Sequence, residues 1–290
     1  MAGVVMFQNE NVKDRVFLVT GAGGGIGRKL VEALLERWGF VVACDVNEGD
    51  LLAMADEFRT HQDRFITHNF NITADEEWEK AIALTVKFAE DKKRKFYGLI
   101  NCAGVLKPGW LSEVDSSQID FHIDINVKGN LYGCVRAAAI FRRARDGHII
   151  NIASLAGVAA VPGIALYSAS KFAVRGFTLA LAEEMSEFGV NVTVVCPDAV
   201  QTGMLDLQLD YEEAALTFSG MGALTPQSVA EEICAVIGSS NREVLIPGWR
   251  GAMAKFSSAL PEITSLIQKP LREMGKNFMT TMKNEKRGIR

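Results

Sequence analysis

The segment that most restricts the fold of this chain is an apolar run that leads into a glycine cluster and then a helical pattern. The run is Arg15–Thr20, the cluster is Gly21–Gly27, and the helical pattern extends from Leu30 to Trp38. Glycines are needed where the backbone takes positive φ and approaches a phosphate closely, and the N-terminus of the following helix attracts anions. A flexible loop is the alternative for the glycines alone. The strand and helix on either side favour a cofactor-binding turn of an α/β sheet.

The alternation of strand and helix patterns continues to about residue 248, without a linker rich in serine or proline and without a long repeat. We therefore predict a single doubly wound, Rossmann-type α/β domain in residues 1–248, with about seven mostly parallel strands and helices on both faces. Its ligand is expected at the carboxyl edge of the strands.

The second predicted strand, Phe40–Asp45, ends in an acid about 20 residues after the glycines. A carboxylate at this position can accept hydrogen bonds from an adenosine ribose, and it repels a 2′-phosphate. Neither Ala22–Gly25 nor Val46 supplies a basic residue to offset that repulsion. Asp45 therefore favours NAD over NADP, with an ordinary strand-ending Asp as the alternative.

A tyrosine and a lysine, Tyr167 and Lys171, stand four residues apart on one predicted helix face. A neighbouring ammonium favours the phenolate and can bring a phenol into the range of a general base at neutral pH. Ser154 lies at the end of the predicted buried strand that begins at His148, which places its hydroxyl at the ligand-binding edge. A Tyr-x-x-x-Lys pattern by itself also arises by chance on amphipathic helices.

These motifs together resemble the short-chain dehydrogenase/reductase family over about residues 14–248: the TGxxxGxG turn, the Asn-Cys-Ala-Gly segment at Asn101, and Ser154 before Tyr-x-x-x-Lys. The resemblance implies a catalytic set of Asn126, Ser154, Tyr167 and Lys171. It also implies cofactor contacts from Gly21, Gly23, Gly25, Ile26, Gly27, Asp45, Asn71, Ile72, Asn101, Ala103, Gly104, Tyr167, Lys171, Pro197, Val200 and Thr202. Three positions depart from the family pattern: Asn71 for an Asp, Cys102 for an Asn, and Asp198 for a Gly.

The resemblance implies NAD-linked interconversion of a secondary alcohol and a ketone, with Tyr167 as general acid/base. It also implies a substrate lid at residues 203–224. The many Met, Leu and Phe residues there predict a hydrophobic substrate, although ordinary surface packing is an equal alternative for each of them. The alternatives are an NADPH-dependent ketoreductase and a non-catalytic NAD(H)-sensing protein on the same fold. Apolar residues on more than one face of the helices at about 112–146 and 165–188 predict a homodimer or homotetramer.

Composition excludes other classes of function. The formal net charge of −4 gives no reason to expect a nucleic-acid partner, and the five scattered cysteines and four histidines lack the spacings of a disulfide framework or metal site. Neither a signal peptide nor a membrane-spanning run is recognised, so a cytoplasmic location is expected.

Residues 249–290 form a basic, amphipathic helical tail with a local charge of +6, and Pro261 and Pro270 are expected to divide it into short helices. Two interpretations compete for this tail. In the first, which we favour, it packs on the protein; in the second, it makes peripheral contact with an anionic membrane.

Overall fold

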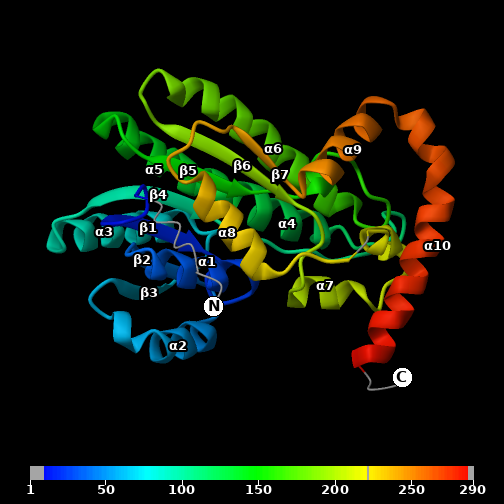
Figure 1. The fold of residues 1–290 in the computed structure, drawn as a ribbon, viewed down its shortest axis with the longest axis horizontal. Coiled ribbons are helices and arrows are strands. Elements are labelled where there is room, and N and C mark those ends of the chain that lie inside the picture. The colour runs from blue at the N-terminus through cyan, green and yellow to red at the C-terminus, as the bar shows by residue number, and fades with distance from the viewer. Residues whose placement is uncertain (1–9, 221, 287–290) are drawn as a thin grey trace, which may run out of the picture.

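The computed structural model describes residues 10–220 and 222–286. Its centre is a sheet of seven parallel strands in the order β3-β2-β1-β4-β5-β6-β7 (Figure 1). The strands are β1 (Arg15–Thr20), β2 (Phe40–Asp45), β3 (Phe65–Asn69), β4 (Lys95–Asn101), β5 (His148–Ile152), β6 (Asn191–Pro197) and β7 (Glu243–Ile246). The predicted doubly wound α/β fold is confirmed, and every described strand pair is parallel.

Helices cover both faces of this sheet. On one face α1 (Gly25–Glu36), α2 (Glu48–Glu57) and α8 (Pro226–Val236) bury their apolar residues against the strands. On the other face α3 (Asp75–Asp91), α5 (Gly129–Ala144) and α6 (Ala165–Ser186) do the same. Because both faces are covered, the strands are apolar along nearly their whole length, as parallel strands require. Four buried residues show this in β1, namely Val16, Phe17, Leu18 and Val19.

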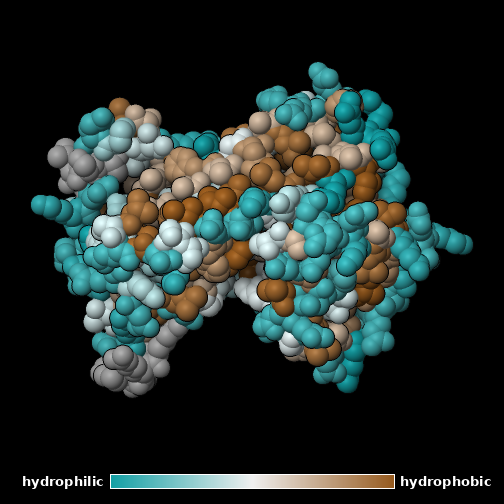
Figure 2. Space-filling model, turned by 180° about the vertical axis from the view of Figure 1, so that it is seen from behind, coloured by the Kyte–Doolittle hydropathy of each residue, from teal (hydrophilic) through white to brown (hydrophobic). Residues whose placement is uncertain are grey.

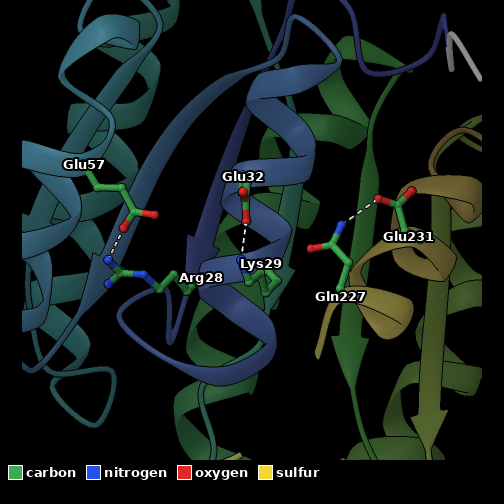
Figure 3. Close-up of polar contacts among 6 residues, drawn as sticks. All are labelled: Arg28, Lys29, Glu32, Glu57, Gln227 and Glu231. Carbon is green, nitrogen blue, oxygen red and sulfur yellow. Dashed lines mark hydrogen bonds and ion pairs between the residues drawn. The ribbon is translucent and has the colours of Figure 1, made fainter. Parts of the chain in front are cut away.

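Polar side chains line the outer surface of the first helical layer. In Figure 3, α1 lies between α2 and α8, with Arg28 bonded to Glu57 of α2 and Gln227 bonded to Glu231 within α8. Glu231 also bonds Arg37, just after α1. The layer thus combines an apolar inner side with ion pairs outside, the pattern that fixes helix orientation on a sheet.

The chain reverses direction in the sheet between β1 and β4. From β1 it proceeds outward to β3, then returns through α3 to β4 on the other side of β1. Loops that leave β1 and β4 therefore diverge at their carboxyl ends and open a crevice, where ligands of such sheets bind. The glycine turn and the Asn101–Gly104 segment both begin there.

Several short elements lie beyond the carboxyl edge. They are α4 (Ser117–Ile123), the π-helical turn η2 (Asp124–Lys128), the 3-10 turns η3 (Leu155–Gly157) and η4 (Glu212–Phe218), and α7 (Gly203–Gln208). A further 3-10 turn, η1 (Arg59–His61), leads from α2 into β3 at the opposite, amino edge. The lid predicted at 203–224 corresponds to α7, η4 and the loop that follows them.

The tail consists of α9 (Gly248–Ala259) and α10 (Pro261–Lys286), which runs along one end of the molecule in Figure 1. The predicted division at Pro261 is confirmed, but the predicted division at Pro270 is wrong, because α10 continues through that residue. A proline removes one backbone hydrogen bond from a helix, and the remainder of a long helix packed on other elements tolerates that loss.

Basic residues of the tail bond acids of the body: Arg250 pairs with Asp198, Lys255 with Glu243, Lys276 with Glu212 and Lys283 with Asp210. The charge excess of the tail is thereby partly neutralised within the chain. These contacts favour the packed interpretation of the tail over the membrane alternative. Within the described residues, no helix combines the length and apolar character needed to cross a membrane.

Candidate active site

The glycine turn holds the N-terminus of α1 directly above the crevice. Gly21 has φ of 65°, and a Cβ there would lie 2.7 Å from the backbone of Ala103, so the turn and the loop after β4 cross almost in contact. Only glycine satisfies both conditions. Thr20, just before the turn, accepts hydrogen bonds from the amides of Cys102 and Ala103 at 3.2 and 3.3 Å. Thr20 is the threonine of the TGxxxGxG motif, and its role in holding the two loops together is not among the site predictions made from the sequence.

The space around the turn fits a dinucleotide. A Cβ added at Gly24 would meet no atom within 4 Å, and one at Gly25 would lie 3.0 Å from Thr202 in the loop after β6. Gly21–Gly27 and Pro197–Thr202, two segments that both contain predicted cofactor contacts, are therefore neighbours. An open turn at a helix N-terminus is the environment that a pyrophosphate requires.

Asp45 occupies the end of β2 beside this turn. Its carboxylate accepts hydrogen bonds from the amides of Gly23 and Asn47, both at 2.9 Å. A carboxylate offers about four acceptor positions, so two bonds leave capacity for ribose hydroxyls. Arg28, the basic residue in the first turn of α1, is engaged by Glu57.

Asn71 is used differently from the sequence expectation. Its side-chain oxygen accepts from the amide of Thr73 at 3.0 Å and from the hydroxyl of Thr73 at 2.9 Å, forming an Asx turn before α3. Contact between that oxygen and an adenine amino group would compete with both bonds. Ile72 packs instead against α5, where a Cβ at Gly129 would lie 2.7 Å from its Cδ1.

Tyr167 and Lys171 extend from the first turns of α6 and are both buried. The Nζ atom of Lys171 lies 5.6 Å from the centroid of the Tyr167 ring and donates to the Ile152 carbonyl at 2.9 Å. Ser154, which caps η3, accepts from the Ala156 amide at 3.1 Å and donates to the Pro197 carbonyl at 3.4 Å. The carboxyl ends of β5 and β6 and the first turns of α6 thus meet around Ser154, Tyr167 and Lys171.

Burial controls the protonation of this pair. It raises the pKa of Tyr167 to about 12, while a hydrogen bond with Ser154 acts in the opposite direction. Burial also lowers the pKa of Lys171 to about 8. Desolvation of the phenolate is the largest influence on the tyrosine pKa, because burial disfavours the charged form. With its pKa at about 12, the tyrosine hydroxyl keeps its proton at neutral pH.

Asn126 lies in the π-helical turn η2 and is completely buried. Its side chain bonds both backbone groups of Val105, at 2.8 Å and 2.9 Å, and donates to Ser170 at 2.9 Å. A Cβ at Gly104 would lie 3.3 Å from both the Asn126 oxygen and the Lys171 Nζ, so these atoms flank the same short segment. Sequence reasoning found Asn126 but neither its Val105 bonds nor the π turn, a distortion frequent at functional sites.

Beneath the site, a buried amide network joins the two central strands. Asn101 donates to Asn151 at 2.8 Å, and Asn151 donates to Thr178 of α6 at 2.9 Å. Asn101 therefore connects β4 to β5 and, through Thr178, to the helix of the tyrosine. Asn101 is the last residue of β4, where the chain continues into the Asn101–Gly104 segment.

Asp198, the departure from the family's glycine, has a partner in the tail. Its side chain is 14% exposed and bonds Arg250 of α9, whose side chain is 24% exposed. Burial raises the pKa of Asp198, and the Arg250 guanidinium opposes that rise. The loop of Pro197–Thr202 is thus attached to α9, an attachment that sequence reasoning missed.

The fold and this arrangement define a nucleotide-binding α/β protein with an acid–base group at its carboxyl edge. A family model described as short chain dehydrogenase matches residues 15–212. An uncharacterized oxidoreductase of Staphylococcus saprophyticus is 33% identical over 198 residues, 68% of this chain and 78% of the relative. One of Staphylococcus aureus strain MW2 is 31% identical over 223 residues, 76% of this chain and 89% of the relative. The chain belongs to the short-chain dehydrogenase family and is an oxidoreductase.

Solved structures agree with the fold. A short-chain dehydrogenase/reductase of Burkholderia phymatum in complex with NAD has a TM-score of 0.78 and 24% identity, covering 88% of this chain and 96% of the other. ElxO with NADP bound has a TM-score of 0.71 and 23% identity, and the match covers 81% of this chain and 97% of ElxO. Because one neighbour holds NAD and the other NADP, the fold alone does not decide between the two cofactors.

Proposed function

We propose that this protein interconverts a secondary alcohol and a ketone with NAD as the hydride carrier, on a hydrophobic substrate. The observation that carries the proposal is the convergence of Ser154, Tyr167 and Lys171 beside a turn that fits a dinucleotide. When bound, the nicotinamide supplies or accepts the hydride. The glycine turn, Asp45 and Pro197–Thr202 would hold the cofactor.

The side chains of this set have distinct parts in the reaction. In ketone reduction, protonated Tyr167 donates its hydroxyl proton to the carbonyl oxygen, and the Ser154 hydroxyl donates a hydrogen bond to the same oxygen as charge develops. In alcohol oxidation the tyrosine takes the proton back. Lys171 binds the nicotinamide ribose and favours the phenolate, and Asn126 fixes the segment beside Lys171 and holds a proton-relay water.

The substrate class follows from the surroundings of Tyr167. Leu106, Ile164 and Ala214 are buried against it, with Val161 and Met204 packed on the same cluster. An apolar environment of this kind excludes charged substrates, because burying an unpaired charge is costly. The test is hydride transfer from NADH to a panel of hydrophobic ketones, including steroid, terpenoid and long-chain acyl compounds. No turnover with any of them would favour a non-catalytic NAD(H)-sensing protein.

We expect NADH to bind at least about tenfold more tightly than NADPH, because Asp45 both bonds the ribose and repels a 2′-phosphate. The substitution Asp45→Ala should narrow this difference, measured by fluorescence titration with both cofactors. Asp45→Asn is the control, since it keeps an acceptor for the Gly23 amide and removes only the charge. Equal affinities in the unmodified protein would show that the NAD preference is wrong.

We further propose a homodimer or homotetramer. Apolar side chains gather in a band across the face seen from behind in Figure 2, and exposed apolar residues of α4 and α5 include Ile119, Phe121 and Val135. Val135 is 67% exposed, so burial against a second copy would remove it from water. Light scattering should give at least twice the monomer mass of 31.7 kDa. The substitution Val135→Asp should lower the measured mass, because it places a charge in the proposed interface. The monomer mass at micromolar concentration would contradict the assembly.

A further inference from the structure

The lid is closed at its base and is contacted on both sides. Leu224 donates to the Ala199 carbonyl at 2.8 Å and accepts from the Gln201 amide at 2.8 Å, so residues 202–223 form an excursion whose two ends are joined. The excursion contains α7 and η4. Its inner side faces the tyrosine and its outer side faces α10.

On the inner side, η4 is pressed against the loop that leads into α6. A Cβ at Gly163 would lie 2.0 Å from the carbonyl oxygen of Glu213. Ala214, the next residue, is completely buried in the cluster that contains Tyr167. The lid therefore packs in the same apolar cluster as Tyr167, the residue that the proposed function uses as its acid–base group.

On the outer side, α10 is pressed against Ala215, the next residue of η4. A Cβ at Gly275 would lie 1.8 Å from the carbonyl oxygen of Ala215. Buried Met279 packs with Leu205, Leu209 and Phe218 of the lid, and Phe278 and Met282 join this cluster. The backbone of α10 at Gly275 thus lies directly against the Ala215 carbonyl of η4. The helix also covers the apolar outer surface of the lid.

Charge pairs contribute less to this contact than packing. Lys276 bonds Glu212, and Lys283 lies 3.5 Å from Asp210, but the two acids are 68% and 82% exposed. Exposed ion pairs contribute little to stability because water screens them, whereas a fully buried Met side chain contributes more. The apolar cluster and the glycine contact therefore hold α10 to the lid.

We propose that α10 holds the lid closed over Tyr167, so that a substrate reaches the tyrosine only when α10 separates from η4. The part about substrate access rests on the proposed function. Gly275 and Met279 are then positioning residues for the lid. They select substrates by size, because a larger substrate needs a wider separation.

The test is amide hydrogen exchange of the full-length protein, with variants in the tail. Gly275→Ala places a methyl group against the Ala215 carbonyl, and Met279→Ala removes the buried side chain without adding atoms. The matched control is Gly248→Ala at the start of α9, where a Cβ would meet no atom within 4 Å. We expect exchange in residues 203–218 to be about tenfold faster in both test variants than in the control, with β1 and β4 unchanged.

Equal exchange in the lid of all three variants would overturn the proposal. The exchange measurement needs no substrate, so its outcome does not depend on whether the proposed activity is correct. With a substrate in hand, the ratio of kcat/KM for a bulky ketone to that for a small one should rise in both test variants. Faster lid exchange with an unchanged ratio of kcat/KM values would also overturn the proposal, because opening of the lid would then not control how a substrate reaches Tyr167.

Discussion

Replacing Tyr167 by Phe is expected to lower turnover by about 10²-fold or more while NADH binding is nearly unchanged. The substitution removes the group that donates the proton and keeps the ring that packs among Leu106, Ile164 and Ala214. Lys171 retains its bond to the Ile152 carbonyl, so its position does not depend on the tyrosine hydroxyl. The measurement is steady-state kinetics on a working ketone, with NADH affinity determined separately by fluorescence.

The matched control for this prediction is Tyr132→Phe on α5, which removes a tyrosine hydroxyl outside the candidate set. Its turnover should equal that of the unmodified protein. A Tyr167→Phe variant with near-parental turnover would refute the catalytic assignment. Loss of NADH binding together with activity would show that the hydroxyl acts on the structure of the site rather than on the proton.

Replacing Arg250 by Met is expected to destabilise the folded protein by about 3 kcal/mol, because it leaves the Asp198 carboxylate buried without a partner. Burial already raises the pKa of Asp198 and Arg250 opposes the rise, so removal of Arg250 raises this pKa further. A carboxyl group whose folded pKa lies above its unfolded value binds more protons in the folded state. Stability of the variant should therefore fall as pH rises through that folded pKa, and urea unfolding at pH 5 and 7.5 measures the difference.

The double variant Arg250→Met with Asp198→Asn should recover most of the lost stability, since the unpaired charge is gone. Lys283→Met is the control on the same tail, because its partner Asp210 is 82% exposed and its loss should cost less than about 1 kcal/mol. Equal losses in the Arg250 and Lys283 variants would contradict a special role for the buried pair. Because Asp198 lies in the Pro197–Thr202 segment that we propose to hold the cofactor, we also expect weaker NADH binding in the Arg250 variant.

Local patterns in the sequence were sufficient for the sheet and for the site's main elements. Buried β-branched runs mark the strands, and the glycine turn between β1 and α1 identifies the carboxyl edge. Once that edge is known, Ser154 at the end of β5 and Tyr167 at the start of α6 must lie near it. The family resemblance added Asn126, which no periodicity distinguishes from an ordinary helical asparagine.

Interactions between distant residues were not accessible from the sequence. Nothing near Asp198 indicates that Arg250, fifty-two positions later, neutralises it. The Asx turn of Asn71 depends on the neighbouring Thr73 and competes with an adenine contact that the family pattern implied. The raised pKa of Tyr167 follows from its burial, a property of the packed molecule. Helix α10 continues through Pro270 because packing of the tail outweighs one lost hydrogen bond.

The contact between α10 and the lid also has a consequence for biosynthesis. Ala215 and Gly275 are sixty positions apart in the chain, so at 5–20 residues per second a ribosome finishes the lid roughly 3–12 s before it reaches the residue that covers it. During that interval the apolar side of the lid, with Leu205, Leu209 and Phe218, lacks its cover and is a binding surface for chaperones. Truncated chains that end before Gly275 are therefore expected to be retained by chaperones, and full-length chains are expected to be released.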